Sequence, residues 1–195
     1  MLINNKKVAI TYRMIIMKIL VINGSPRKGG NTEILLDAMI SGAEEAGATI
    51  TNVELRSLDV SPCRACDACK KTGICVQKDD MHDLISKMEE CEVWILGTPV
   101  YWWGVTAQLK AFVDRWYGVS RDVFKGRKAV LAVPFESSNP RTARHIVGMF
   151  EDIFAYLEME QIGAVLAPGV YDRGDIKEKT EYLEEATKLG KSITS

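Results

Sequence analysis

Histidine is scarce in this sequence, and long apolar runs and an excess of charge of either sign are absent. The 195 residues include two histidines, and 25 Lys and Arg against 26 Asp and Glu give a formal net charge of −1. Duplex nucleic acid and anionic membranes favour a basic surface, so neither partner is expected. No apolar stretch approaches the roughly 18 residues of a membrane-spanning helix. The composition, 47% hydrophobic and 26% charged, fits one domain over residues 1–195.

The amino-terminal segment, residues 1–17, lacks the pattern of a secretion signal. Arg13 interrupts its apolar part, and a small-residue cleavage site is missing. We therefore expect a cytoplasmic protein with this segment as an N-terminal extension. The segment is either an extra edge strand over residues 8–12 or a stretch upstream of a natural start at Met17.

Short apolar runs alternate with segments of helical periodicity along the rest of the chain. The runs predict strands at 18–23, 49–55, 92–97, 129–134 and 162–166. The helical segments are 31–46, a short helix begun by Asp79 or Asp80, 106–117, one from 139 to about 158, and a last helix capped by Asp175. Because each strand is followed by a helix, we expect an α/β fold with a doubly wound parallel sheet.

The chain also lacks the two common nucleotide motifs, GxxxxGK[ST] and GxGxxG. Residues 24–32 (GSPRKGGNT) instead connect the first strand to the first helix. A helix start binds phosphate through free amide groups and the positive end of its dipole. The candidate ligands here are the donors Ser25, Arg27, Asn31 and Thr32, with Gly29 and Gly30 letting the backbone close around the anion.

A second candidate loop, residues 97–106 (GTPVYWWGVT), leaves the third predicted strand. In doubly wound sheets, ligands bind outside the carboxyl ends of the strands at the switch point, so this loop should face the phosphate loop. Its amides can bond the polar edge of a flat ring, and its aromatic side chains offer faces for stacking. The candidates are Thr98, Pro99, Val100, Tyr101, Trp102, Trp103 and Gly104. Core or dimer-interface packing is the alternative for Trp102 and Trp103.

GSPRKGGNT and GTPVYWWGVTAQLKAFVDR together resemble the NAD(P)H-dependent FMN reductase and iron–sulfur flavoprotein group of flavodoxin-like proteins. The resemblance covers about residues 18–189. It implies a three-layer flavodoxin-like fold with strand order 2-1-3-4-5, FMN as cofactor, and a homodimer or homotetramer. It also implies that the loop at 135–139 completes the flavin site. No catalytic side chain is required, because the flavin carries the chemistry.

Four of the five cysteines lie within thirteen residues, in a segment (61–78) that we interpret as an insertion. They are Cys63, Cys66, Cys69 and Cys75, spaced x2, x2 and x5. Such clustering without a secretion signal indicates a metal or redox site rather than a disulfide framework. The motif resembles that of the iron–sulfur flavoproteins, and four thiolates are the ligands of a 4Fe–4S cluster. Tetrahedral zinc, a redox-active disulfide and free thiols are the alternatives, and Cys91 is expected to be a small buried hydrophobe.

The expected function is FMN-dependent electron transfer with a 4Fe–4S cluster as relay, from a donor such as ferredoxin to an oxidant. One alternative is an NAD(P)H-dependent FMN or quinone reductase without a cluster, and another is a zinc-stabilised module whose aromatic loop binds a protein. The two histidines are expected at the surface or at helix caps, and Asp79 and Asp80 at a helix start. Tyr171 either covers a flavin or belongs to a simple loop.

Overall fold

The computed structural model describes residues 16–194 and contains one parallel sheet of five strands. The strands are β1 (Lys18–Asn23), β2 (Thr49–Glu54), β3 (Val93–Gly97), β4 (Lys128–Phe135) and β5 (Glu160–Pro168), in the order β2-β1-β3-β4-β5. This order confirms the flavodoxin-like fold expected from the sequence. The possible strand over residues 8–12 lies outside the described residues.

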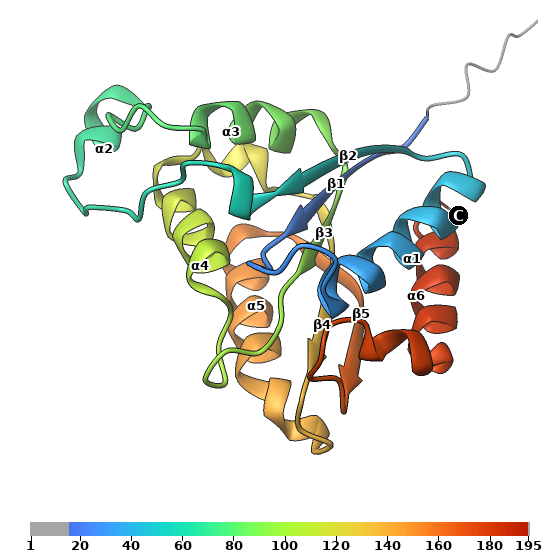
Figure 1. Cartoon of the computed structure of the whole chain (residues 1–195). Coiled ribbons are helices and arrows are strands. Elements are labelled where there is room, and N and C mark those ends of the chain that lie inside the picture. The colour runs from blue at the N-terminus through green and yellow to red at the C-terminus, as the bar shows by residue number, and fades with distance from the viewer. Residues whose placement is uncertain (1–15, 195) are drawn as a thin grey trace, which may run out of the picture.

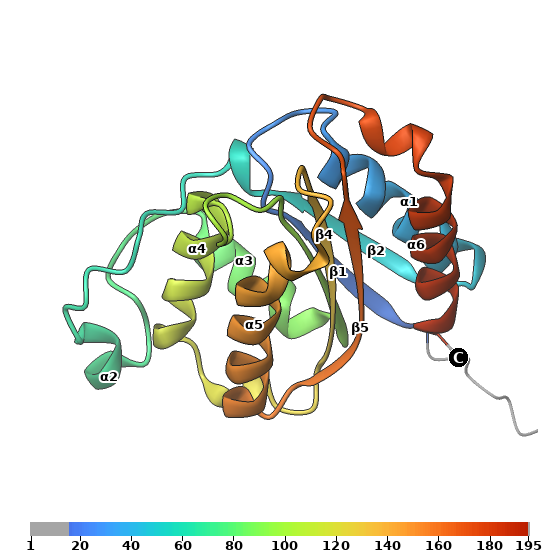
Figure 2. The same cartoon turned by 90° about the horizontal axis from the view of Figure 1, so that it is seen from below.

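Helices cover both faces of the sheet and make the molecule three layers thick (Figure 2). On one face lie α1 (Asn31–Glu45) and α6 (Thr180–Ser192), and on the other lie α3 (Met81–Glu90), α4 (Ala107–Asp114) and α5 (Arg144–Leu157). A further short helix, α2 (Ala68–Thr72), belongs to the cysteine segment and projects from one end of the molecule (Figure 1). Within residues 16–194, none of the helices is long and apolar enough to cross a bilayer.

Two hydrophobic cores form because successive side chains of a strand point to opposite faces of the sheet. In β1, Leu20 and Ile22 enter the core beneath α3, α4 and α5, which is built around aromatic rings. Ile19 and Val21 enter the opposite core beneath α1 and α6, which is aliphatic. Both sets are fully buried, which explains why the sequence of this strand is a continuous apolar run.

Glycine permits an unusually close approach of α1 to α6. A Cβ atom at Gly42 would overlap the backbone of Thr187, and one at Gly190 would overlap the carbonyl of Met39. Neither backbone can move without shifting a whole helix. The pair of glycines therefore fixes how these helices cross, and with them the position of the first turn of α1.

Two helix starts differ from the sequence prediction. Asp175 opens a 3-10 turn (Asp175–Glu178), and α6 begins only at Thr180. The carboxylate of Asp175 instead accepts hydrogen bonds from the amides of Tyr171 at 2.9 Å and Asp172 at 2.7 Å, so it organises the preceding loop. Similarly, Asn139 caps a 3-10 turn (Pro140–Ala143) rather than α5 itself.

Candidate functional site

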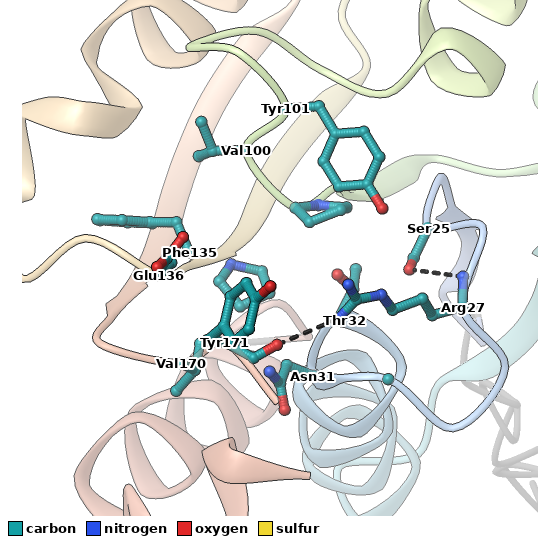
Figure 3. A pocket seen from close by; sticks show the side chains of 13 residues that line it. Ser25, Arg27, Asn31, Thr32, Val100, Tyr101, Phe135, Glu136, Val170 and Tyr171 are labelled. Carbon is teal, nitrogen blue, oxygen red and sulfur yellow. Dashed lines mark hydrogen bonds between the residues drawn. The ribbon is translucent and has the colours of Figure 1, made fainter. Parts of the chain in front are cut away.

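A cavity lies at the carboxyl ends of β1, β3, β4 and β5, where the two candidate loops meet (Figure 3). The phosphate loop and the loop after β3 both contribute, as the switch-point argument predicts. The lining residues are Ser25, Arg27, Gly30, Asn31, Thr32, Pro99, Val100, Tyr101, Pro134, Phe135, Glu136, Val170 and Tyr171.

Direct hydrogen bonds hold the two loops together at the carboxyl ends of β1 and β3. The amide of Gly24 donates to the carbonyl of Gly97 at 2.8 Å, and a side chain at Gly24 would collide with that carbonyl and with Leu109. Thr106 donates its hydroxyl to the carbonyl of Gly24 at 2.6 Å, and the same oxygen accepts the amide of Leu109 as the N-cap of α4. The register between the loops is therefore fixed by one backbone–backbone bond and one side-chain bond to the backbone.

The phosphate loop leaves the start of α1 without a side-chain cap. Gly30 is the N-cap residue and has no side chain to bond the first-turn amides of α1, and Gly30, Asn31 and Thr32 all line the cavity. The buried Ser25 hydroxyl accepts the amide of Arg27 at 3.2 Å, which shapes the loop. Gly29 adopts a φ of 64° and its amide donates to the Glu33 carboxylate, which also pairs with Arg56 at 3.1 Å.

The side chain of Asn31 is used inside the protein rather than directed freely at a ligand. Its Nδ2 donates to the carbonyl of Asp172 at 2.9 Å, and its Oδ1 accepts the amides of Gly174 and Ile176. Arg27 similarly donates to the carbonyl of Tyr171 at 3.1 Å (Figure 3). Asn31 thus fastens the loop after β5 to the phosphate loop, a role that sequence reasoning did not identify.

The aromatic loop forms a tight two-residue turn. Tyr101 and Gly104 exchange both backbone hydrogen bonds, each at 2.9 Å, around Trp102 and Trp103. The two tryptophans have φ values of 48° and 60°, a conformation that usually selects Asn and Gly. Trp102 is 91% exposed and Trp103 50% exposed.

Six of the seven predicted ligands of the aromatic loop fall into three groups, and the seventh, Gly104, closes the turn and lines neither opening. Pro99, Val100 and Tyr101 line the cavity, whereas Trp102 and Trp103 line a neighbouring groove with Ser137 and Glu136. Thr98 is fully buried and accepts the amide of Thr106 at 3.3 Å, so it supports the turn from behind. From the loop at 135–139, Phe135 and Glu136 reach the cavity, and Tyr171 lines it from the loop after β5.

These residues fit FMN by their donor chemistry. An uncapped helix start with a buried hydroxyl and an arginine beside it suits a phosphate. Apolar and aromatic side chains, from Pro99 to Tyr101 and from Phe135, suit the faces of a flat ring.

The four clustered cysteines converge on a second pocket, between α2 and the end of α4. Cys63, Cys66, Cys69 and Cys75 all line it, together with Arg115, Tyr117 and Gly118. Among the described residues, no three Cys, His, Asp or Glu side chains are arranged to hold a single metal ion. Tetrahedral zinc with bonds of about 2.3 Å would bring its thiolates to within roughly 4 Å of one another. A 4Fe–4S cubane uses one thiolate per iron and spreads the same four ligands wider.

A buried ion pair joins the two ends of the cysteine segment. Arg115, 3% exposed, pairs with both carboxylate oxygens of Asp79, at 2.5 and 3.1 Å. The same guanidinium donates to the carbonyl of Ser61 at 2.9 Å and to Sγ of Cys75 at 3.4 Å. Burial acts to raise the pKa of Asp79, but the bonds from Arg115 and from the Ser61 amide outweigh it, so the pKa lies below its usual value.

Sequence reasoning missed this pair and placed Asp79 only at a helix start. Asp79 does accept the amide of Met81 there, at 3.2 Å. The signal that was available is an arginine at the end of an apolar helix, flanked by the buried Val113 and Trp116. His82 contacts the carbonyl of Cys75 at 3.1 Å. Cys91 is 1% exposed and burial raises the pKa of its thiol, which confirms it as a buried hydrophobe.

Comparison with known proteins identifies the family. The profile of the NADPH-dependent FMN reductase family matches residues 17–171. The chain belongs to this family. The membership confirms the expectation, based on the two loop motifs, of an FMN-dependent oxidoreductase.

Individual relatives and structures agree with this assignment. An iron–sulfur flavoprotein of Archaeoglobus fulgidus is 34% identical over 179 residues, covering 91% of this chain and 79% of that protein. YwqN of Bacillus subtilis, named an NAD(P)H-dependent FMN-containing oxidoreductase, is 31% identical over 89% of this chain and 96% of its own length. The structure of an NAD(P)H:quinone oxidoreductase from Methanothermobacter marburgensis shares the fold, with a TM-score of 0.74 and 17% identity over 91% of this chain and 99% of that one.

Proposed function

We propose that this FMN-dependent oxidoreductase is an electron-transfer flavoprotein whose four clustered cysteines hold a 4Fe–4S cluster. The observation that carries the proposal is the convergence of Cys63, Cys66, Cys69 and Cys75 on one pocket, in a chain with an FMN site. The relative from Archaeoglobus fulgidus, named an iron–sulfur flavoprotein, supports it. When bound, the cluster supplies one-electron transfer and FMN couples such steps to a two-electron, two-proton exchange.

The residues of the chain have distinct roles in this function. The amides of Gly30 to Thr32, with Ser25 and Arg27, bind the FMN phosphate, and residues 98–104 receive the ring. The cysteines sit in an exposed segment, with Cys66 open to solvent, so a small protein donor such as ferredoxin can approach them. Two electrons from two donor molecules would leave together to one oxidant, such as oxygen, peroxide or a quinone. The protein works as a homodimer or homotetramer in the cytoplasm.

Metal and flavin analysis of anaerobically purified protein tests the proposal. We expect one FMN, about four iron and four labile sulfide per chain, and a broad absorbance near 400 nm that dithionite bleaches. Replacing Cys66 or Cys69 by Ser should remove the iron and leave the FMN, whereas Cys91→Ala should retain both. FMN with stoichiometric zinc, or FMN without metal, would refute the proposal.

A reductase without a cluster is the second candidate, supported by the near full-length match to YwqN. Two electrons would then arrive as a hydride from NAD(P)H and leave to a flavin or quinone. The rate of reduction by each electron donor distinguishes the two candidates. A protein with a cluster relay is reduced rapidly by ferredoxin and slowly by NADPH, whereas a reductase without a cluster is reduced rapidly by NADPH and slowly by ferredoxin.

A further inference from the structure

Arg115 lines the cysteine pocket, and its ion pair with Asp79 is far more deeply buried than an ion pair at the protein surface. The side chains are 1% and 4% exposed. A charge buried to this degree is costly even when paired, and Nε of Arg115 has no hydrogen-bond partner among the described residues, so stability alone does not explain the pair. The Arg115 guanidinium donates hydrogen bonds to both the Asp79 carboxylate and Sγ of Cys75, so the pair also acts on the cysteine pocket.

The pair also fixes both ends of the cysteine segment. Arg115 holds the carbonyl of Ser61, and Asp79 accepts the amide of the same residue at 3.2 Å. Asp59, two residues before Ser61, and Asp80, the residue after Asp79, exchange two further hydrogen bonds, at 2.7 and 3.0 Å. The chain therefore enters and leaves the segment at one fixed point, and the Arg115 guanidinium, which lines the pocket, bonds both sides of that point.

We infer that Arg115 is a positioning residue for the metal centre: it donates a hydrogen bond to the Cys75 thiolate and raises the reduction potential of the cluster. This inference rests on the proposed function. Reduction adds one negative charge to the cluster, and a buried positive charge and a hydrogen bond to sulfur favour the more negative state. Little water is present to screen the interaction, because Arg115 is almost wholly buried.

Asp79 limits how far Arg115 raises the reduction potential of the cluster. Its carboxylate neutralises part of the positive charge of Arg115 and holds the guanidinium plane so that one nitrogen reaches Sγ. Lysine can retain the charge but cannot serve Asp79, Ser61 and Cys75 together, because it lacks the planar fork of arginine. Arg64 provides a matched comparison, since it lines the same pocket but is exposed to solvent.

The test is a redox titration of the reduced-cluster EPR signal in the flavin-loaded protein. At the wild-type midpoint, Arg115→Gln should lower the reduced-to-oxidised ratio about tenfold, which is about 59 mV for a one-electron couple. Arg115→Lys should lower it less, Asp79→Asn should raise it, and Arg64→Gln should leave it unchanged. A purely structural role would instead change the iron content and leave the potential of the remaining clusters at the wild-type value.

The outcomes separate this inference from the proposed function. Wild-type protein with FMN but no iron overturns both. Wild-type protein with iron, combined with wild-type midpoints in both Arg115 variants, overturns only the inference. Where the Arg115 variants lose iron, Asp79→Asn decides, because it keeps the arginine: a raised midpoint supports the inference, and an unchanged or lowered midpoint overturns it.

Discussion

The hydroxyl of Thr106 donates to the carbonyl of Gly24 at 2.6 Å and at the same time caps α4 by accepting the amide of Leu109 at 3.3 Å. One oxygen atom thereby connects the first strand's loop to the helix that follows the third strand. Both groups are buried, so water cannot replace either bond.

Thr106→Val should therefore weaken both the fold and the flavin site. It removes an N-cap and leaves a buried carbonyl without its donor, for a combined loss of about 2–4 kcal/mol in the free energy of unfolding. Urea denaturation measures the loss. Thr106→Ser keeps the hydroxyl and should recover most of the stability; a valine variant as stable as the serine variant would contradict this role.

Gly30→Ala tests the phosphate site. The backbone of Gly30 has a φ of −83°, which alanine tolerates, but the new Cβ would lie 3.1 Å from Cβ of Arg27 and 3.2 Å from its carbonyl oxygen. We expect FMN affinity to fall about tenfold, roughly 1.4 kcal/mol, and riboflavin affinity to change little because riboflavin lacks the phosphate. Gly148→Ala, in α5 with no atom within 4 Å, is the control and should stabilise the helix by ~0.5–1 kcal/mol. Equal losses for both flavins would count against a phosphate site here.

The Trp102–Trp103 turn stores backbone strain. A positive φ in a residue other than Gly costs on the order of 1 kcal/mol or more, and it persists mainly at functional sites. The double replacement Trp102→Asn with Trp103→Gly should raise the free energy of unfolding by about 1–2 kcal/mol and slow flavin reoxidation by a quinone. Stopped-flow absorbance and urea denaturation measure the two effects. An unstable variant would show that the rings contribute more by packing than their exposure indicates.

Protonation of Asp79 in acid should destabilise the contact between the two ends of the cysteine segment. Because its folded-state pKa is lowered, the carboxylate contributes stability that is complete above the unfolded value of about 3.9 and is lost as the pH falls through the folded pKa. The stability difference between wild type and Asp79→Asn should therefore shrink as the pH is lowered below 4. Circular dichroism during urea titrations between pH 2.5 and 6 tests this; a pH-independent difference would exclude the carboxylate as its source.

Close helix packing gives a prediction independent of any cofactor. Gly42→Ala places a Cβ against the backbone of Thr187, which only a movement of α1 away from α6 can relieve. We expect a loss of about 3 kcal/mol in the free energy of unfolding. Gly47→Ala provides the contrast: Gly47 has open space around it but a φ of 90°, so its cost comes from backbone strain alone.

Local patterns predicted the strands, the family resemblance implied their order, and the structure places the two candidate loops around one cavity. Apolar runs predict β1 and β3, and a glycine-rich stretch before a helix predicts a phosphate site, because both signals are local in the sequence. The role of Asn31 could not be predicted, because its partners at Asp172 to Ile176 arrive only when β5 is placed. The Trp102–Trp103 turn was equally hidden, since its usual signal is Asn-Gly. Arg115 and Asp79 lie 36 residues apart, and only the folded chain brings them together.

The attachment of Asn31 to the loop after β5 has a consequence for biosynthesis. Residues on the phosphate loop are completed by contacts more than 140 positions later in the chain. In a nascent polypeptide the phosphate loop would therefore lack these contacts until almost the whole domain had left the ribosome, since contacts between residues far apart in the sequence form last. Coenzyme loading would then be a late, post-translational event, and carboxy-terminal truncations should yield colourless protein even where the sheet survives.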